Sequence, residues 1–137
     1  MNSPIYPTNY FADASLILEQ HYTNVDNSEL MSAFGVFDFN VAETESNVVN
    51  FLTVSDNSNH VDYSTALFAL GKTYKAEYKQ IYIEAMQRCL ASNSQAVYQA
   101  GIAIENLGEC IFNSVSLIQD EVEMLKRAQT FLARQGS

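Results

Sequence analysis

Positive charge is missing from the first half of this sequence. Between Met1 and Gly71 there is neither a lysine nor an arginine, whereas the same segment holds nine acidic residues. The remaining residues, 72–137, carry seven acids and seven bases, so the whole net charge of -9 belongs to the first half. Self-repulsion of this kind destabilises a compact state. Solubility explains a modest excess, but a base-free segment of this length favours a role in binding something basic.

Helix breakers and long apolar runs are also scarce. Two prolines and five glycines in 137 residues favour long regular elements. No apolar run approaches the roughly 18 residues that a membrane-spanning helix needs, and the first ten residues lack the basic and apolar regions of a signal peptide. We therefore expect a cytoplasmic protein with no membrane partner. In that compartment Cys89 and Cys110 are expected to be reduced, each buried among apolar neighbours.

No known catalytic or metal-binding motif occurs. The sequence has no HExxH, CxxC or GxSxG pattern, and its glycines are too scattered to form a phosphate-binding loop. His60 and Asp62 are predicted to form a solvated pair in a polar loop. Glu105 and Glu109 are predicted to share one solvated helical face, because no Glu-x-x-His pair accompanies them. The sequence thus predicts a protein that is not an enzyme and needs neither cofactor nor metal.

The spacing of apolar residues is mostly helical in the first half. Steps of three and four residues predict a first helix over 11–22. Asp26, with Glu29 three residues later, has the pattern of a capping box and predicts a second helix that ends near Gly35. A third helix is expected from Thr44, although the β-branched residues there make a short strand near 47–54 the alternative.

The second half has clearer periodicity. An apolar series over 67–89 predicts a helix of six turns that Gly71 can break or bend near its start. Ser94 is the expected cap of a helix that reaches Ile111, in which two glycines (Gly101 and Gly108) allow close approach of a neighbour. A final helix is predicted over 115–132, with Ile118 and Val122 on its apolar face.

These elements predict an all-α fold: one helical bundle of five to seven helices over residues 1–137. It would combine an acidic half, 1–71, with a charge-neutral half, 72–137. Lys72, Lys75 and Lys79 form a helical stripe interleaved with tyrosines, a combination that can bind nucleic acid. A net charge of -9 repels a polyanion, however. We predict instead that the stripe pairs with carboxylates of the first half inside the fold, and that the protein has no nucleic-acid partner.

Aromatic and acidic residues gather around the stretch FGVFDFNVAETES, residues 34–46. Interface hot spots favour aromatic anchors, and complementary charge steers a partner to its site. Phe34 and Phe37, taken singly, are better explained as core residues, whereas the acids are expected to face outward. The predicted partner-binding residues are Asp38, Glu43, Glu45, Asp56, Asp62, Phe37, Phe39 and Tyr63.

In these respects the chain resembles the immunity proteins that bacteria make against their own toxins, including those of contact-dependent growth inhibition systems. The resemblance lies in its size, its helical content, its lack of a signal peptide and its base-free segment from Met1 to Gly71. It implies a cytoplasmic inhibitor that covers the active site of a basic toxin domain, often a nuclease, with acidic side chains in place of substrate phosphates. Two alternatives stay open: a helical adaptor or oligomeric structural subunit, and an enzyme or ligand binder with an unrecognised pocket.

Overall fold

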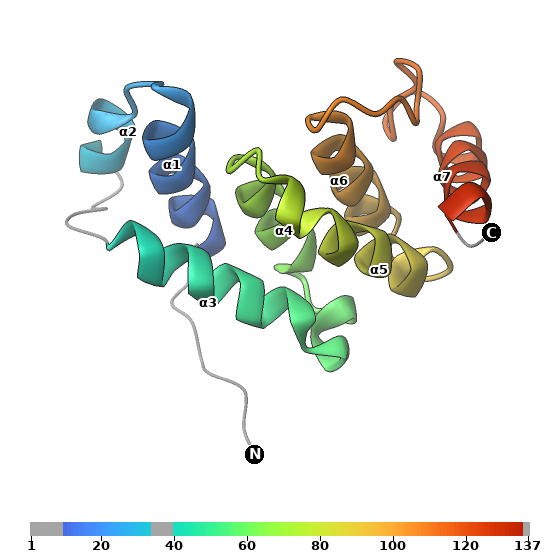
Figure 1. Ribbon diagram of the computed structural model, residues 1–137, viewed down its shortest axis with the longest axis horizontal. Coiled ribbons are helices and arrows are strands. Elements are labelled where there is room, and N and C mark those ends of the chain that lie inside the picture. Colours follow the sequence, from blue (N-terminus) through green and yellow to red (C-terminus); the bar gives the residue numbers. More distant parts are fainter. Residues whose placement is uncertain (1–9, 34–39, 136–137) are drawn as a thin grey trace.

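The computed structural model describes residues 10–33 and 40–135, and within these ranges the chain is helical and contains no strand (Figure 1). The all-α prediction is therefore confirmed, and the alternative of a strand near 47–54 is wrong. No helix in these ranges is long and apolar enough to cross a bilayer. The elements are α1 (Tyr10–Thr23), α2 (Ser28–Ala33), α3 (Val41–Thr53), the 3-10 helix η1 (Ser55–Asn59), α4 (Tyr63–Gly71), the 3-10 helix η2 (Ala76–Tyr78), α5 (Lys79–Cys89), α6 (Ser94–Glu105) and α7 (Glu121–Gln135).

Helix α4 lies at the centre of the bundle. It packs against α1 and α3 on one side and against α6 on the other, while α5 covers α6. Figure 1 shows α1, α4, α6 and α7 following one another across the molecule, with α3 and α5 lying over them. The core includes Leu18, Leu67, Met86 and Ile104, all fully buried, and each such side chain contributes about 2 kcal/mol to folding. The acidic and neutral halves of the sequence therefore share one core.

Helices α3 and α6 begin at asparagine caps. The side chain of Asn40 accepts a hydrogen bond from the amide of Glu43, at 3.0 Å. The side chain of Asn93 accepts one from the amide of Ala96, at 3.1 Å. Each bond satisfies one of the amides that a helix leaves without a partner at its start. Asn93, and not the expected Ser94, is thus the cap of α6.

The start of α2 also differs from the expected capping box. The Asp26 carboxylate accepts from the nearby amide of Ser28, and Glu29 takes no part in the cap. Asn27 between them is buried, and its side-chain amide donates to the carboxylate of Glu19 on α1, at 3.0 Å. This contact fixes α2 against α1. The predicted helix end at Gly35 lies outside the described residues.

The predicted six-turn helix over 67–89 is interrupted. Helix α4 ends at Gly71, as the glycine indicated, and α5 begins only at Lys79. Between them Tyr74 has a φ of 54°, in the left-handed region. Gly71 is buried, and a Cβ there would lie 3.2 Å from the Cβ of Ala103 on α6. The close contact of α4 with α6 therefore favours a glycine at this position.

Helix α6 ends earlier than predicted. One oxygen of Glu105 accepts hydrogen bonds from the amides of Ile111 and Phe112, both at 3.0 Å, and Gly108 turns the chain with a φ of 105°. The turn lays the Phe112 ring on Gly101, where an added Cβ would lie 2.3 Å from ring carbons. Close approach at Gly101 is confirmed, whereas Gly108 serves the turn.

Helix α7 starts at Glu121, later than the predicted start near residue 115, because Asp120 caps it by accepting from the amide of Glu123 at 3.0 Å. Ile118 and Val122, which the periodicity placed in the core, are 96% and 63% exposed. The buried face of α7 consists of Met124, Ala128 and Phe131. Both cysteines are free, but only Cys89 is buried; Cys110 is exposed, so its predicted burial is wrong.

Candidate protein-binding surface

Two lysines of the helical stripe are held in ion pairs that cross the fold. The ammonium of Lys72 lies 2.8 Å from a carboxylate oxygen of Glu19 on α1, and that of Lys75 lies 2.7 Å from a carboxylate oxygen of Glu45 on α3. The prediction that the stripe pairs with carboxylates of the first half is confirmed for both. Their positive charges neutralise acids within the fold.

Lys79 differs, because it pairs with Glu109 of the second half. The predicted acidic face of Glu105 and Glu109 is also wrong. Helix α6 ends at Glu105, whose carboxylate binds two amides of the following turn. Each of the two acids therefore has its own structural partner. Among the described residues, no group of three or more histidine, cysteine, aspartate or glutamate side chains could hold a metal ion.

The carboxylate of Glu45 is the most enclosed charged group of the described chain. One oxygen accepts the hydroxyl of Tyr22, and the other accepts both the hydroxyl of Tyr78 and the ammonium of Lys75. Only 8% of the Glu45 side chain is exposed. Burial raises the pKa of Glu45, but the hydrogen bonds from Lys75 and the two tyrosines outweigh it and hold the pKa below its usual value. A cavity of about 380 Å³ adjoins this cluster.

Two predicted partner-binding residues, Glu45 and Tyr63, are therefore wrong as surface contacts. Glu45 is an acid of the interior, already bonded to three donors. Tyr63 is fully buried; its hydroxyl donates to the Leu52 carbonyl oxygen at 3.0 Å and accepts from Arg88 at 3.1 Å. Both side chains hold α3 and α4 to their neighbours and are not available to a partner.

The remaining predicted contact residues do not form one site in the described structure. Three of them lie outside the described residues: Phe37, Asp38 and Phe39. Glu43 and Asp56 are exposed, but Glu43 is in the first turn of α3, whereas Asp56 is in η1, beyond the other end of that helix. A helix of 13 residues is about 20 Å long. These two acids therefore belong to an extended acidic surface and not to one compact site.

Asp62 is the last of the predicted acids and lies just before α4. Its carboxylate is 3.9 Å from the His60 ring, and about half of each side chain is exposed, 43% and 49% respectively. The prediction of a solvated His60–Asp62 pair is confirmed. The His60 Nδ1 also accepts a hydrogen bond from the Asp62 amide, at 3.0 Å.

Sequence reasoning missed acids on other elements. Within the described ranges, which contain all seven bases, only Lys126 and Arg134 are exposed among the bases, and the others are partly buried. Eight acids are exposed in the same ranges: Asp26, Glu29, Glu43, Asp56, Glu77, Glu84, Asp120 and Glu121. They belong to both halves of the sequence and are spread over the described elements. Over the part of the chain that the structure describes, the ratio of exposed acids to exposed bases is thus higher than the ratio in the composition, because most of the bases are partly buried.

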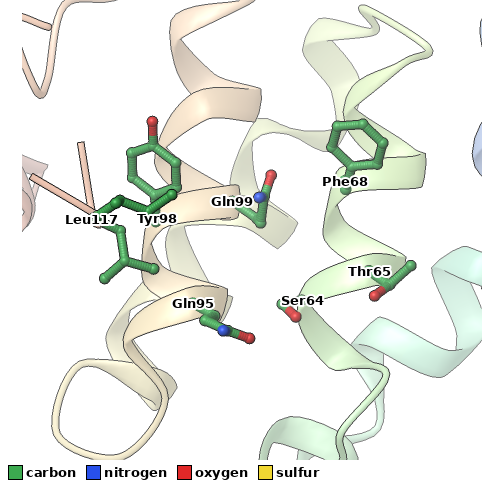
Figure 2. A pocket seen from close by; sticks show the side chains of 8 residues that line it. Ser64, Thr65, Phe68, Gln95, Tyr98, Gln99 and Leu117 are labelled. Atoms are coloured by element: carbon green, nitrogen blue, oxygen red, sulfur yellow. The ribbon is translucent and has the colours of Figure 1, made fainter. Parts of the chain in front are cut away.

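An apolar groove between α4 and α6 was also not predicted (Figure 2). It has a volume of about 450 Å³. Figure 2 shows Phe68 of α4 on one side, Tyr98 and Leu117 on the other, and Gln99 between them. Phe68 is 42% exposed, and Ile118, which also lines the groove, is 96% exposed. The groove depends on packing between distant segments, so no local sequence pattern indicated it.

Comparison of the chain with protein-family models, with curated proteins and with solved structures finds no match. The exposed charges and the geometry of the described residues therefore carry the functional proposal.

Proposed function

We propose that this protein binds and neutralises a basic protein partner, acting as an immunity protein that covers the active site of a cognate toxin domain. A nuclease domain is the proposed partner, because its active site attracts the phosphates of a nucleic acid. The observation that carries the proposal is the surface charge of the described residues: eight exposed acids against two exposed bases. The excess of negative charge gives such a partner a complementary surface.

The internal ion pairs support this proposal. Lys72 and Lys75 neutralise carboxylates across the fold, and Lys79 neutralises Glu109, so their charges do not offset the outer acids toward a partner approaching elsewhere. An uncompensated field of this kind attracts a basic protein over a distance of about one Debye length, roughly 10 Å at moderate salt. It can raise association rates by one to three orders of magnitude. Fast capture is what an inhibitor of a toxic enzyme requires.

The spread of the exposed acids also fits an extended binding surface. Glu43 is in the first turn of α3 and Asp56 is in η1, beyond the other end of this helix, which is about 20 Å long. A nuclease binds several successive phosphates along a basic cleft. A set of separated carboxylates on a rigid helical surface would occupy such a cleft without being cleaved.

The test is affinity capture from the source cell with this chain as bait, followed by mass spectrometry and reconstitution with the purified partner. We expect a basic protein whose affinity falls at least roughly tenfold between about 50 mM and about 500 mM salt. We also expect loss of its enzymatic activity when the complex forms. A neutral or acidic partner, or an affinity that salt does not change, would contradict the proposal.

A second candidate is a helical adaptor or oligomeric subunit, which the exposed groove between α4 and α6 favours. Sedimentation velocity over a range of concentrations separates the two. A stable homo-oligomer that buries Ile118 would support this second function. A monomer that binds a basic protein would support the first.

A further inference from the structure

The groove between α4 and α6 continues beyond the part shown in Figure 2. A second cavity, of about 190 Å³, shares Phe68 and Gln99 with the first and extends to Gly71 and Asn106. The combined groove therefore follows α4 from Ser64 to Gly71. At 1.5 Å per residue this length is about 12 Å.

The lining is well suited to burying apolar side chains of another molecule. Ile118 is almost fully exposed and Phe68 is nearly half exposed, and covering such side chains gains about 25 cal/mol per Å². The polar lining side chains have no hydrogen-bond partner within the described residues and can therefore bond to an occupant; they are Ser64, Thr65, Gln95 and Gln99. An apolar floor with a few polar groups is the usual composition of a recognition groove.

The walls also determine the conformation of the occupant. The groove is formed by two helices, whose backbone groups are bonded within each helix, and it offers no strand edge. A bound segment cannot extend a sheet there, whereas a helix satisfies its own backbone hydrogen bonds, so a helix is the occupant that these walls favour. A length of about 12 Å accommodates about two helical turns. Apolar side chains at positions i, i+3 or i+4, and i+7 of such a helix would point into the groove.

Negative charge at one end of the groove determines which end of the bound segment carries a basic residue. Asp120 and Glu121, both exposed, follow Ile118 by two and three residues. Glu121 also accepts a hydrogen bond from Ser94, the neighbour of the lining residue Gln95, at 2.9 Å. The Glu121 carboxylate therefore lies beside this end, and Asp120 directly precedes it in the chain. At the other end Lys72 is already paired with Glu19.

We infer that the α4–α6 groove binds an amphipathic helix of the basic partner, with its apolar face against Phe68 and Ile118 and a lysine or arginine beside Asp120 and Glu121. This inference rests on the proposed function, since it names how the basic partner is held. The exposed acids attract the partner, and the groove retains it. The groove should therefore affect mainly the dissociation rate, and the outer acids mainly the association rate.

The test uses a phage-displayed library of random 16-residue peptides, selected on the intact protein. We expect the enriched peptides to have apolar residues at helical spacing and a basic residue near one end. One enriched peptide is then synthesised and its binding is measured by fluorescence anisotropy. The Phe68→Ser/Ile118→Ser double variant should weaken binding at least tenfold, mainly through faster dissociation. Leu30→Ser, on α2 at the far side of α1 from α4, is the matched control because Leu30 is also about half exposed (48%), and it should leave binding unchanged.

The possible failures are distinguishable. If basic peptides are enriched but bind the double variant and the wild type equally, the groove inference is wrong and the proposed function stands. Enrichment of peptides without basic residues, or no enrichment at low salt, would contradict both. Circular dichroism must show that the double variant is as helical as the wild type. If it is not, the Ile118→Ser single variant, whose side chain is 96% exposed, replaces it, and unchanged peptide affinity in that variant again overturns the inference.

Discussion

Glu45 and Lys75, thirty residues apart in the sequence, form an ion pair at 2.7 Å in which the carboxylate is almost completely shielded from solvent. The pair joins α3 to the connection between α4 and α5. The hydroxyls of Tyr22 and Tyr78 complete the surroundings of the carboxylate. An acid from a segment without bases is thus balanced by a lysine from the other half of the chain. Its role is to hold three elements together and not to meet a partner.

Replacing Glu45 should therefore destabilise the fold. Glu45→Gln keeps the shape of the side chain but removes a charge that binds Lys75 and two tyrosine hydroxyls, and we expect the free energy of unfolding to fall by about 2 kcal/mol. Glu123→Gln is the matched control, because Glu123 also forms an ion pair, with Arg127, but 39% of its side chain is exposed. That variant should change stability by less than about 0.5 kcal/mol. Urea denaturation monitored by circular dichroism measures both, and equal effects would contradict a structural role for Glu45.

Acid should remove the contribution of Glu45. Because its pKa in the folded protein lies below the usual value, the ionised carboxylate stabilises the fold above the unfolded-state pKa, about 4.3. That stabilisation is lost as the pH falls through the folded-state pKa. The pKa of Lys75 is raised by the same pair, so Lys75 stays charged throughout the acidic range. The difference in stability between wild type and Glu45→Gln should be constant from about pH 6 to 8 and should shrink below about pH 4. A difference that does not change with pH would show that charge is not involved.

The packing of the 107–112 turn can be tested at Gly101. Alanine there gains about 1 kcal/mol of helix propensity, but its Cβ would lie 2.3 Å from the Phe112 ring. We expect Gly101→Ala to be destabilising by about 2 kcal/mol overall. In a double-mutant cycle with Phe112→Leu, the smaller side chain should recover part of the loss. A neutral or stabilising Gly101→Ala would mean that Phe112 does not pack on this glycine.

The two thiols should react at very different rates. Cys110 is exposed, whereas Cys89 is fully buried and its burial raises the pKa of the thiol. Ellman's reagent should therefore modify one cysteine in the native protein and both in denaturant. The Cys110→Ser variant should show no native-state reaction. Rapid modification of that variant would place Cys89 nearer the surface than the structure does.

Outer charge should control association with the captured partner. Glu43→Lys and Glu84→Lys each reverse an exposed acid, and each should slow association several-fold while changing stability little. Lys126→Glu reverses an exposed base and should accelerate association. Surface plasmon resonance at two salt concentrations measures the rates, and the differences should diminish at high salt. Opposite signs, or effects confined to dissociation, would contradict steering by the outer acids.

Local patterns predicted the helices well, because the spacing of residues such as Phe11, Ala14 and Leu18 is read directly from the sequence and they are buried in the structure. The interruptions were less predictable. Gly71 indicated a break, but the left-handed conformation of Tyr74 depends on how the chain must turn after α4 packs on α6. The apolar periodicity that placed Ile118 in the core was wrong because Asp120 starts α7 after it.

The site was harder to predict than the fold. The burial of Glu45 depends on donors at positions 22, 75 and 78, which no local pattern connects. The sequence predicts Tyr63 as a surface anchor, but in the structure its hydroxyl is hydrogen-bonded to the Leu52 carbonyl and to Arg88 inside the fold. The base-free half predicted that the exposed charge would be negative. The size of the excess was not predictable, since it depends on which lysines pair with carboxylates of the fold.

The ion pairs of Lys72 and Lys75 cross the boundary between the base-free half and the rest of the chain. A fragment that ended at residue 71 would keep the acids but lose every cation that offsets them, together with α6, on which α4 packs. Neither this fragment nor the complementary fragment 72–137 should therefore fold alone, whereas the two mixed at low salt should reassemble as a split protein. In such a split protein the ion pairs of Lys72 and Lys75 would act between two separate chains, so added salt should weaken the reassembly.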